Sequence, residues 1–158
     1  MDVLKLNLKE HGAWSKETNS NGVGVVIRDS EGEVLGAYAS KQTRCVDSFI
    51  VEAKAAVCAL DFAQEMGLRN IILEGDRLTV IKKLQAREAA FSPIGILISE
   101  AKLRVSLFNS CNFNHVRRTN HEVAHLLTKY EIGISNELFW VEDVPNFIQN
   151  AIMYDRLN

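Results

Sequence analysis

The spacing of hydrophobic and polar residues near the N-terminus is that of half-buried strands. Leu4, Leu6 and Leu8 share one face of the first segment, and charged or amide side chains occupy the other. The second and third segments are joined by the turn sequence of residues 29–32, so we expect an antiparallel meander. The three predicted strands cover residues 3–9, 22–28 and 33–40.

From residue 49 onward the hydrophobic period becomes that of a helix. Apolar residues recur every three or four positions from Phe49 to Ala63, and we expect this stripe to be core, with Gly67 ending the helix. The chain beyond Gly133 is expected to be an irregular tail with at most one last turn of helix. Between these come a strand at 70–76, helices at 77–86 and 93–107, a strand at 112–117 and a helix at 121–130.

This order predicts an α/β fold with a five-stranded mixed sheet. The first three strands form the meander, the fourth and fifth strands extend it, and helices flank the sheet. A chain of 158 residues suits one domain, and the sequence contains neither an internal repeat nor a linker. We therefore predict a single domain over residues 1–150, followed by a C-terminal tail at 151–158.

Composition and charge exclude several classes of protein. With 47% hydrophobic and 24% charged residues, the sequence is not that of a disordered or low-complexity chain. A net charge of -2 argues against binding through bulk positive charge, although a local basic patch stays open. No apolar run approaches the roughly 20 residues of a membrane-spanning helix, and the alternating N-terminus is not a signal peptide.

The cysteines point to a reducing compartment. Cys45, Cys58 and Cys111 are widely spaced, odd in number and outside any CxxC motif. This usage is typical of free thiols and not of disulfides or a cysteine zinc site. We therefore expect an intracellular, soluble protein of the cytoplasm or nucleus.

Two carboxylates are placed where they could meet. Glu52 lies in the first turns of the predicted helix, and Asp76 ends the predicted fourth strand. Such oxygen ligands suit Mg²⁺, and a pair of such ions can promote phosphodiester cleavage. The alternative is that Glu52 is a solvated helix charge and that Asp76 only caps the next helix.

A series of short motifs runs along residues 4–147. The motifs are Lys5-Leu-Asn-Leu, Gly12-Ala-Trp, Asn21 to Asp29, Val51 to Ala56, Ile72 to Asp76, His115 to Arg118, Val123-Ala-His125 and Val141 to Pro145. Each motif is weak alone, whereas together they are specific. In this order they resemble the ribonuclease H superfamily over nearly all of residues 4–147, and the similarity is greatest to plant ribonuclease H-like domains derived from retroelement reverse transcriptases.

The resemblance implies an RNA/DNA hybrid as ligand and Mg²⁺- or Mn²⁺-dependent cleavage of its RNA strand. In that family four acidic positions hold two divalent ions, and the second and third fall on Glu52 and Asp76. The fourth aligns with His125, which would act near the attacking or leaving oxygen. The plant branch commonly carries histidine there, so this departure alone does not imply inactivity.

The first acidic position departs from the family pattern. The segment before Gly12 is about two residues longer than usual and lacks the expected aspartate, whose place falls on Lys9 or His11. On a regular strand Glu10 points away from these two residues, and only a bulge would turn it toward the metals as a ligand. Because a lysine puts positive charge where cations must sit, the sequence argues against a fully competent site.

Four further residues are candidates for contact with nucleic acid. The resemblance places Gly12 and Trp14 in the first loop, and Arg117 and Arg118 before the last predicted helix. Arginine forks suit phosphate oxygens, and a tryptophan can stack on a base. Alternatively, Trp14 packs its loop and the arginines are a solvated pair. Lys82, Lys83 and Arg87 are a weaker basic cluster.

Three functions are carried forward. The first is an RNase H-type endoribonuclease, and the second is a catalytically inactive module that binds nucleic acid or a protein partner. Because the first aspartate is missing, the sequence favours the inactive module as the description of this protein's activity, whereas the endoribonuclease describes its ancestry. The third is a zinc peptidase, because His121-Glu-Val-Ala-His125 matches HExxH with Glu122 as base, although no second helix is well placed for a third ligand.

Overall fold

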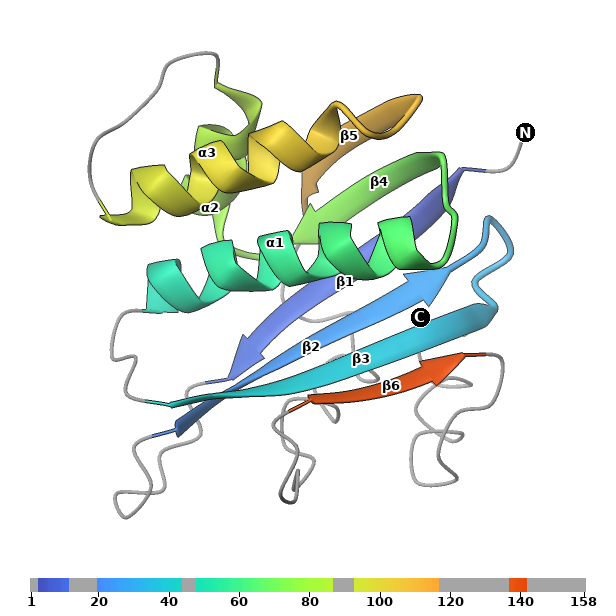
Figure 1. Ribbon diagram of the computed structural model, residues 1–158, viewed down its shortest axis with the longest axis horizontal. Coiled ribbons are helices and arrows are strands. Elements are labelled where there is room, and N and C mark those ends of the chain that lie inside the picture. Colours follow the sequence, from blue (N-terminus) through green and yellow to red (C-terminus); the bar gives the residue numbers. More distant parts are fainter. Residues whose placement is uncertain (1–2, 12–19, 44–47, 87–92, 117–136, 142–158) are drawn as a thin grey trace.

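The computed structural model describes residues 3–11, 20–43, 48–86, 93–116 and 137–141. These residues form six strands and three helices in one mixed α/β arrangement (Figure 1). In chain order the elements are β1 (Leu4–His11), β2 (Ser20–Arg28), β3 (Val34–Thr43), α1 (Ser48–Glu65), β4 (Asn70–Gly75), α2 (Leu78–Gln85), α3 (Pro93–Val105), β5 (Ser110–His115) and β6 (Glu137–Val141).

The strands lie in the order β5-β4-β1-β2-β3-β6. β1, β2 and β3 form the predicted antiparallel meander, and β4 and β5 join the other edge of β1 in parallel. The three described helices lie together on one face of this sheet (Figure 1). The mixed sheet with flanking helices confirms the predicted fold class.

The sheet has one strand more than the sequence predicted. The segment expected to be an irregular tail contains β6, which pairs antiparallel with β3 from Gly36↔Val141 to Ser40↔Glu137. This pairing covers the backbone groups of β3 that would otherwise form an open sheet edge. Sequence reasoning missed β6 because its stabilisation comes from a partner about a hundred residues earlier. The helix predicted at 121–130 lies outside the described residues.

The turn between β2 and β3 shows why the meander forms where it does. The side chain of Asp29 accepts hydrogen bonds from the backbone N–H groups of Glu31 and Glu33, at 2.9 and 3.0 Å. Gly32 has a φ of 85°, a conformation that glycine adopts without the steric cost of a Cβ atom. The predicted turn chemistry is therefore confirmed.

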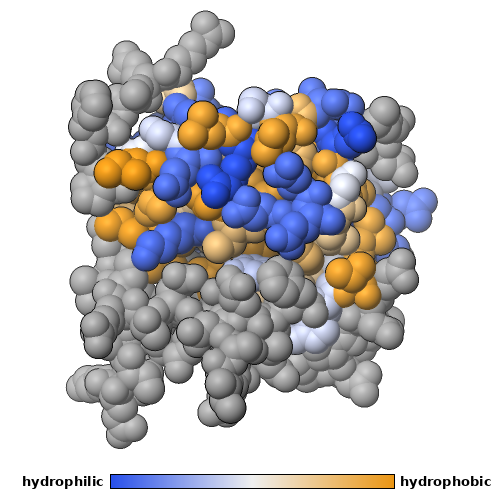
Figure 2. Space-filling view, in the orientation of Figure 1, coloured by the Kyte–Doolittle hydropathy of each residue, from blue (hydrophilic) through white to orange (hydrophobic). Residues whose placement is uncertain are grey.

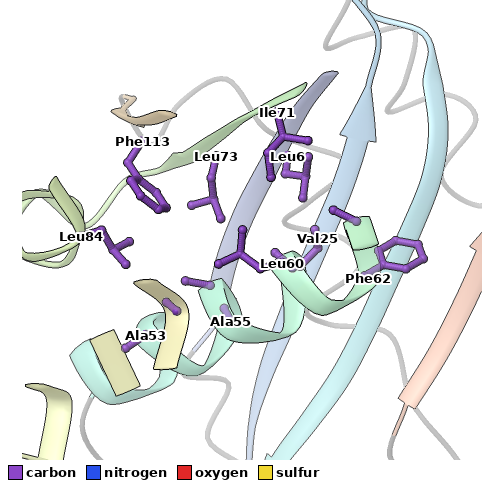
Figure 3. Close-up of a cluster of buried hydrophobic side chains, with 14 of the residues drawn as sticks. Leu6, Val25, Ala53, Ala55, Leu60, Phe62, Ile71, Leu73, Leu84 and Phe113 are labelled. Atoms are coloured by element: carbon purple, nitrogen blue, oxygen red, sulfur yellow. The ribbon is translucent and has the colours of Figure 1, made fainter. Parts of the chain in front are cut away.

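The core lies between α1 and the sheet. α1 presents a row of small residues to the strands, which lets its backbone approach them closely. Figure 3 shows Leu60 of α1 in one buried cluster with Leu6 of β1 and Leu73 of β4. The buried alanines of α1 are Ala53, Ala55, Ala56, Ala59 and Ala63.

Two features position the remaining helices. α2 is amphipathic and buries Val80, Ile81 and Leu84. α3 is linked to α1 by an ion pair in which Arg104 Nε lies 2.7 Å from Asp61 Oδ1. No helix within the described ranges is long and apolar enough to cross a membrane.

Candidate nucleic-acid site at the ends of β1 and β4

Glu52 has the most deeply buried charged side chain among the residues that the structure describes. It lies one turn into α1, has no exposed surface, and both of its carboxylate oxygens are buried. The carboxylate lies against Gly75, the last residue of β4, because a Cβ atom there would be only 2.8 Å from Glu52 Oε1. The expectation that Glu52 is a solvated helix charge is therefore wrong.

Asp76 follows at once, where the chain leaves β4. It is partly exposed, and its backbone is held from the neighbouring strand. His115 Nε2 lies 3.2 Å from the carbonyl oxygen of Asp76, and the N–H of Val116 donates to the carbonyl of Gly75 at 2.9 Å. β5 therefore holds the backbone where the chain leaves β4. Glu52 and Asp76 are thus brought to one edge of the sheet.

The backbone register decides which β1 position lies beside Asp76. β1 and β4 pair in parallel from Leu4↔Ile71 to Asn7↔Glu74. Continued two residues past its last pair, this register would set Lys9 level with Asp76, which favours Lys9 over His11 as the counterpart of the missing acidic residue. The side chain of Lys9 lies outside the described part of the structure.

β1 contains no bulge that could redirect Glu10. It pairs with β2 without a register shift from Lys5↔Arg28 to His11↔Gly22. Glu10 therefore lies at a regular position of the strand, four residues after Leu6. A metal-ligand role for Glu10 that depends on a bulge has no support in the backbone of β1.

The described residues do not by themselves fit a pair of divalent ions. Glu52 and Asp76 supply hard oxygen donors, which Mg²⁺ prefers. However, no group of three or more His, Cys, Asp or Glu side chains suited to a metal occurs in the parts of the chain that the structure describes. Two carboxylates are fewer than a two-metal site needs.

The other predicted site residues fall elsewhere. Gly12, Trp14, Arg117, Arg118 and His125 lie outside the described residues, as does the whole HExxH motif, so their predicted roles stay predictions. The residues of α2 are described. Lys82 is exposed and Lys83 is half-buried in its last turn.

Sequence reasoning assigned one residue of this edge wrongly. Phe49 was expected to belong to the core stripe of its helix, but 40% of its surface is exposed. The guanidinium carbon of Arg77 lies 5.9 Å from the centroid of its ring. Helical spacing predicts which residues share one face of α1, but it does not show how far along the helix that face is covered, and Phe49 lies in the first turn.

The cysteines in the described ranges, Cys58 and Cys111, are both free thiols. Burial raises the pKa of the Cys111 thiol from 9.0 to about 11. Cys111 lies on β5 and packs against the core, so it behaves as a small apolar residue at neutral pH.

We expect Cys111 to react slowly with iodoacetamide in the native protein. In a Cys45→Ser/Cys58→Ser variant at pH 8, the thiolate fraction should be about a hundredfold below that of the urea-unfolded chain. Stability should also fall as the pH rises from 9 toward 11, because the unfolded chain loses the proton first. A native alkylation midpoint near pH 9 would contradict this prediction.

Comparison with solved structures identifies the fold. RNase H1 from the archaeon Halobacterium salinarum has a TM-score of 0.70 and 22% identity, over 80% of this chain and 95% of that one. The RNase H domain of Rv2228c from Mycobacterium tuberculosis, fused to maltose-binding protein, has a TM-score of 0.64 and 20% identity, over 80% and 92%. LC11-RNase H1, from compost, was solved with an RNA/DNA hybrid and has a TM-score of 0.68 and 17% identity, over 80% and 94%.

The sequence comparison identifies the family. No curated protein gives a significant match. The family model described as reverse transcriptase-like matches residues 9–131, which is more than half of the chain and includes Glu52 on α1 and Asp76 just after β4. At these identities the solved structures establish the shared RNase H-like fold alone. The chain therefore belongs to the reverse transcriptase-like family and is an RNase H-like domain.

Proposed function

We propose that this domain binds RNA/DNA hybrids and that its ability to cleave the RNA strand is impaired or lost. The fold supports the first part, since LC11-RNase H1 shares it and was solved with a hybrid. The observation that carries the second part is the parallel register of β1 and β4, whose continuation past Asn7↔Glu74 would set Lys9 level with Asp76. An ammonium group at this edge would oppose the binding of divalent cations.

The roles of the individual residues follow from this proposal. Glu52 and Asp76 are the retained carboxylates of the ancestral metal site, and Mg²⁺ or Mn²⁺ would supply the Lewis acid of cleavage if any activity persists. His125 would then assist proton transfer. Gly12, Trp14, Arg117 and Arg118 would contact the hybrid, whose 2′-hydroxyl groups distinguish its RNA strand. Such a role fits the cytoplasm or nucleus and the plant branch of the family.

A second candidate is a regulatory module that acts through a protein partner. Apolar side chains on and just after α3 favour it, since Ile96, Leu103 and Leu107 are 58%, 73% and 57% exposed. On this face, however, apolar residues lie in separate patches among hydrophilic ones (Figure 2). Scattered apolar residues are ordinary on protein surfaces, so hybrid binding is the stronger proposal.

The test measures binding and cleavage separately. We expect a fluorescein-labelled RNA/DNA hybrid to bind more tightly than a DNA duplex of the same sequence in fluorescence anisotropy. We expect no cleavage beyond that of the Asp76→Asn variant in either Mg²⁺ or Mn²⁺. Cleavage that Asp76→Asn abolishes would contradict the loss of activity, whereas folded protein without hybrid binding would contradict the proposal and favour the protein-partner alternative.

A further inference from the structure

Two contacts from the β5 segment hold Asp76 in line with β4. The N–H of Val116, just after β5, donates to the carbonyl of Gly75 at 2.9 Å, and His115 Nε2 lies 3.2 Å from the carbonyl oxygen of Asp76. These contacts continue the β4–β5 pairing, whose last pair is Gly75↔His115. The chain therefore stays beside the sheet at Asp76, before α2 begins at Leu78.

β1 also continues as a regular strand past its last pair with β4. It lies between β2 and β4 (Figure 1), and its pairing with β2 runs without a shift through His11. The last β1–β4 pair is Asn7↔Glu74. Two further residues along both segments set Lys9 level with Asp76, so the register places a basic residue beside an acidic one.

Glu52 and Asp76, here called the carboxylate edge, would by themselves repel nucleic acid. Glu52 has no exposed surface and lies against Gly75, the residue before Asp76. Carboxylates repel the phosphates of a hybrid, and the repulsion is stronger where burial excludes water. A hybrid that passes this edge therefore needs a positive charge there.

The chain itself supplies such a charge. Within the described residues, no group of three or more His, Cys, Asp or Glu side chains could hold a metal ion. Lys9, in contrast, brings a positive charge to the register position of Asp76. An ammonium group donates hydrogen bonds to carboxylates and to phosphates alike.

We propose that Lys9 is a built-in cation that takes the place of a divalent ion at the carboxylate edge, so that the domain binds an RNA/DNA hybrid without divalent metal. This inference rests on the proposed hybrid binding and adds that the binding is independent of Mg²⁺ and Mn²⁺. The positive charge reduces the repulsion between the carboxylate edge and the phosphates. The residue that impairs cleavage thus maintains binding.

The experiment measures binding of a fluorescein-labelled hybrid by fluorescence anisotropy in EDTA. Lys9→Met removes the charge but keeps an unbranched side chain, and it should weaken binding about fivefold, as for one partly exposed charge pair. Adding Asp76→Asn should recover most of this loss, because the charge that Lys9 offsets is then gone. Lys5→Met is the matched control, since Lys5 lies on the same strand but pairs with Ile72, and its effect should be smaller.

Mg²⁺ gives a second readout on the same proteins. The natural protein should bind the hybrid in EDTA at least as tightly as in Mg²⁺ at equal ionic strength. Lys9→Met should bind more tightly in Mg²⁺ than in EDTA, because one or two carboxylates together with phosphates can hold this ion. Lys5→Met should behave like the natural protein.

Three results would overturn the inference alone. The first is a natural protein that binds the hybrid only in Mg²⁺. The second is a loss in Lys9→Met no larger than that in Lys5→Met. The third is a loss that Asp76→Asn does not reduce, which would mean that Lys9 acts on phosphates without the carboxylate edge.

A protein that binds no hybrid in either condition would overturn the proposed hybrid binding, and thermal melting would then decide the role of Lys9. Lys9→Met should melt at a lower temperature than Lys5→Met, and Asp76→Asn should recover the difference. Melting without this recovery would overturn the inference as well.

Discussion

Replacing Lys9 with aspartate should give the domain a response to divalent metal that the natural sequence lacks. The register of β1 and β4, continued two residues past its last pair, sets Lys9 level with Asp76, and Glu52 lies against the preceding residue, Gly75. The variant therefore exchanges a positive charge at this edge for a third carboxylate. Mg²⁺ or Mn²⁺ at ten times its Kd should then raise the free energy of unfolding by about 1.4 kcal/mol.

Two measurements follow from this variant. In thermal melting, Lys9→Asp should show a metal-dependent rise in Tm of roughly 3–6 °C, whereas the natural protein should show no such rise. In a cleavage assay, Lys9→Asp should gain metal-dependent cutting of the hybrid, and adding Asp76→Asn should remove it. Melting reports on metal binding even where the remaining site is too incomplete for catalysis.

Lys5→Asp is the control for charge alone. Lys5 lies on the same strand at the same parity, but it pairs with Ile72, and four residues place it about 13 Å from Lys9. It makes the same change of charge away from the carboxylates and should show no metal response. A rise of the same size in both variants, or in neither, would show that position 9 is not the missing ligand.

A methyl group at Gly75 should destabilise the domain. The Cβ atom of alanine would lie 2.8 Å from Glu52 Oε1, so that the buried carboxylate would have to move, and 3.3 Å from Ile81 Cδ1, which is a tight contact. Overpacking of this kind costs about 1–3 kcal/mol of unfolding free energy. For a chain of this length, that corresponds to a fall in Tm of roughly 2–12 °C in thermal melting.

Shortening the side chain of Glu52 tests whether contact with it causes the loss of stability in Gly75→Ala. Glu52→Asp withdraws the carboxylate by one methylene, so it should recover part of the stability lost in Gly75→Ala. Gly67→Ala is the matched control, because Gly67 has a φ of 75° and no atom within 4 Å of its added Cβ. Gly67→Ala should lower the free energy of unfolding through the backbone conformation alone, so Glu52→Asp should not reduce this loss. Equal recovery in both backgrounds would contradict contact with Glu52 as the cause.

Most of the fold could be predicted because its signals are local. The alternation at β1, the Asp29 and Gly32 turn and the alanine-rich period of α1 each act within a few residues. Strand order and handedness then leave few arrangements for a meander followed by helix–strand units. β6 was missed because its pairing with β3 spans about a hundred residues, and no local pattern encodes such a partner.

The candidate site could be predicted only in part, for the same reason. Residue types and motif order singled out Glu52 and Asp76. Their positions in the sequence could not show whether Glu52 is solvated or buried. In the structure it has no exposed surface and lies against Gly75. Nor could they choose between Lys9 and His11, since that choice depends on the register of β1 against β4.

The sequence by itself determined the family, the meander, the helices of the described core and the absence of the usual first aspartate. Local spacing and residue chemistry are enough for each of these. Only the tertiary structure decided the register of β1 against β4, the burial of Glu52 and the exposure of Phe49 under Arg77. Register and burial depend on contacts between residues far apart in the chain, and such contacts exist only once the sheet and helices have packed together.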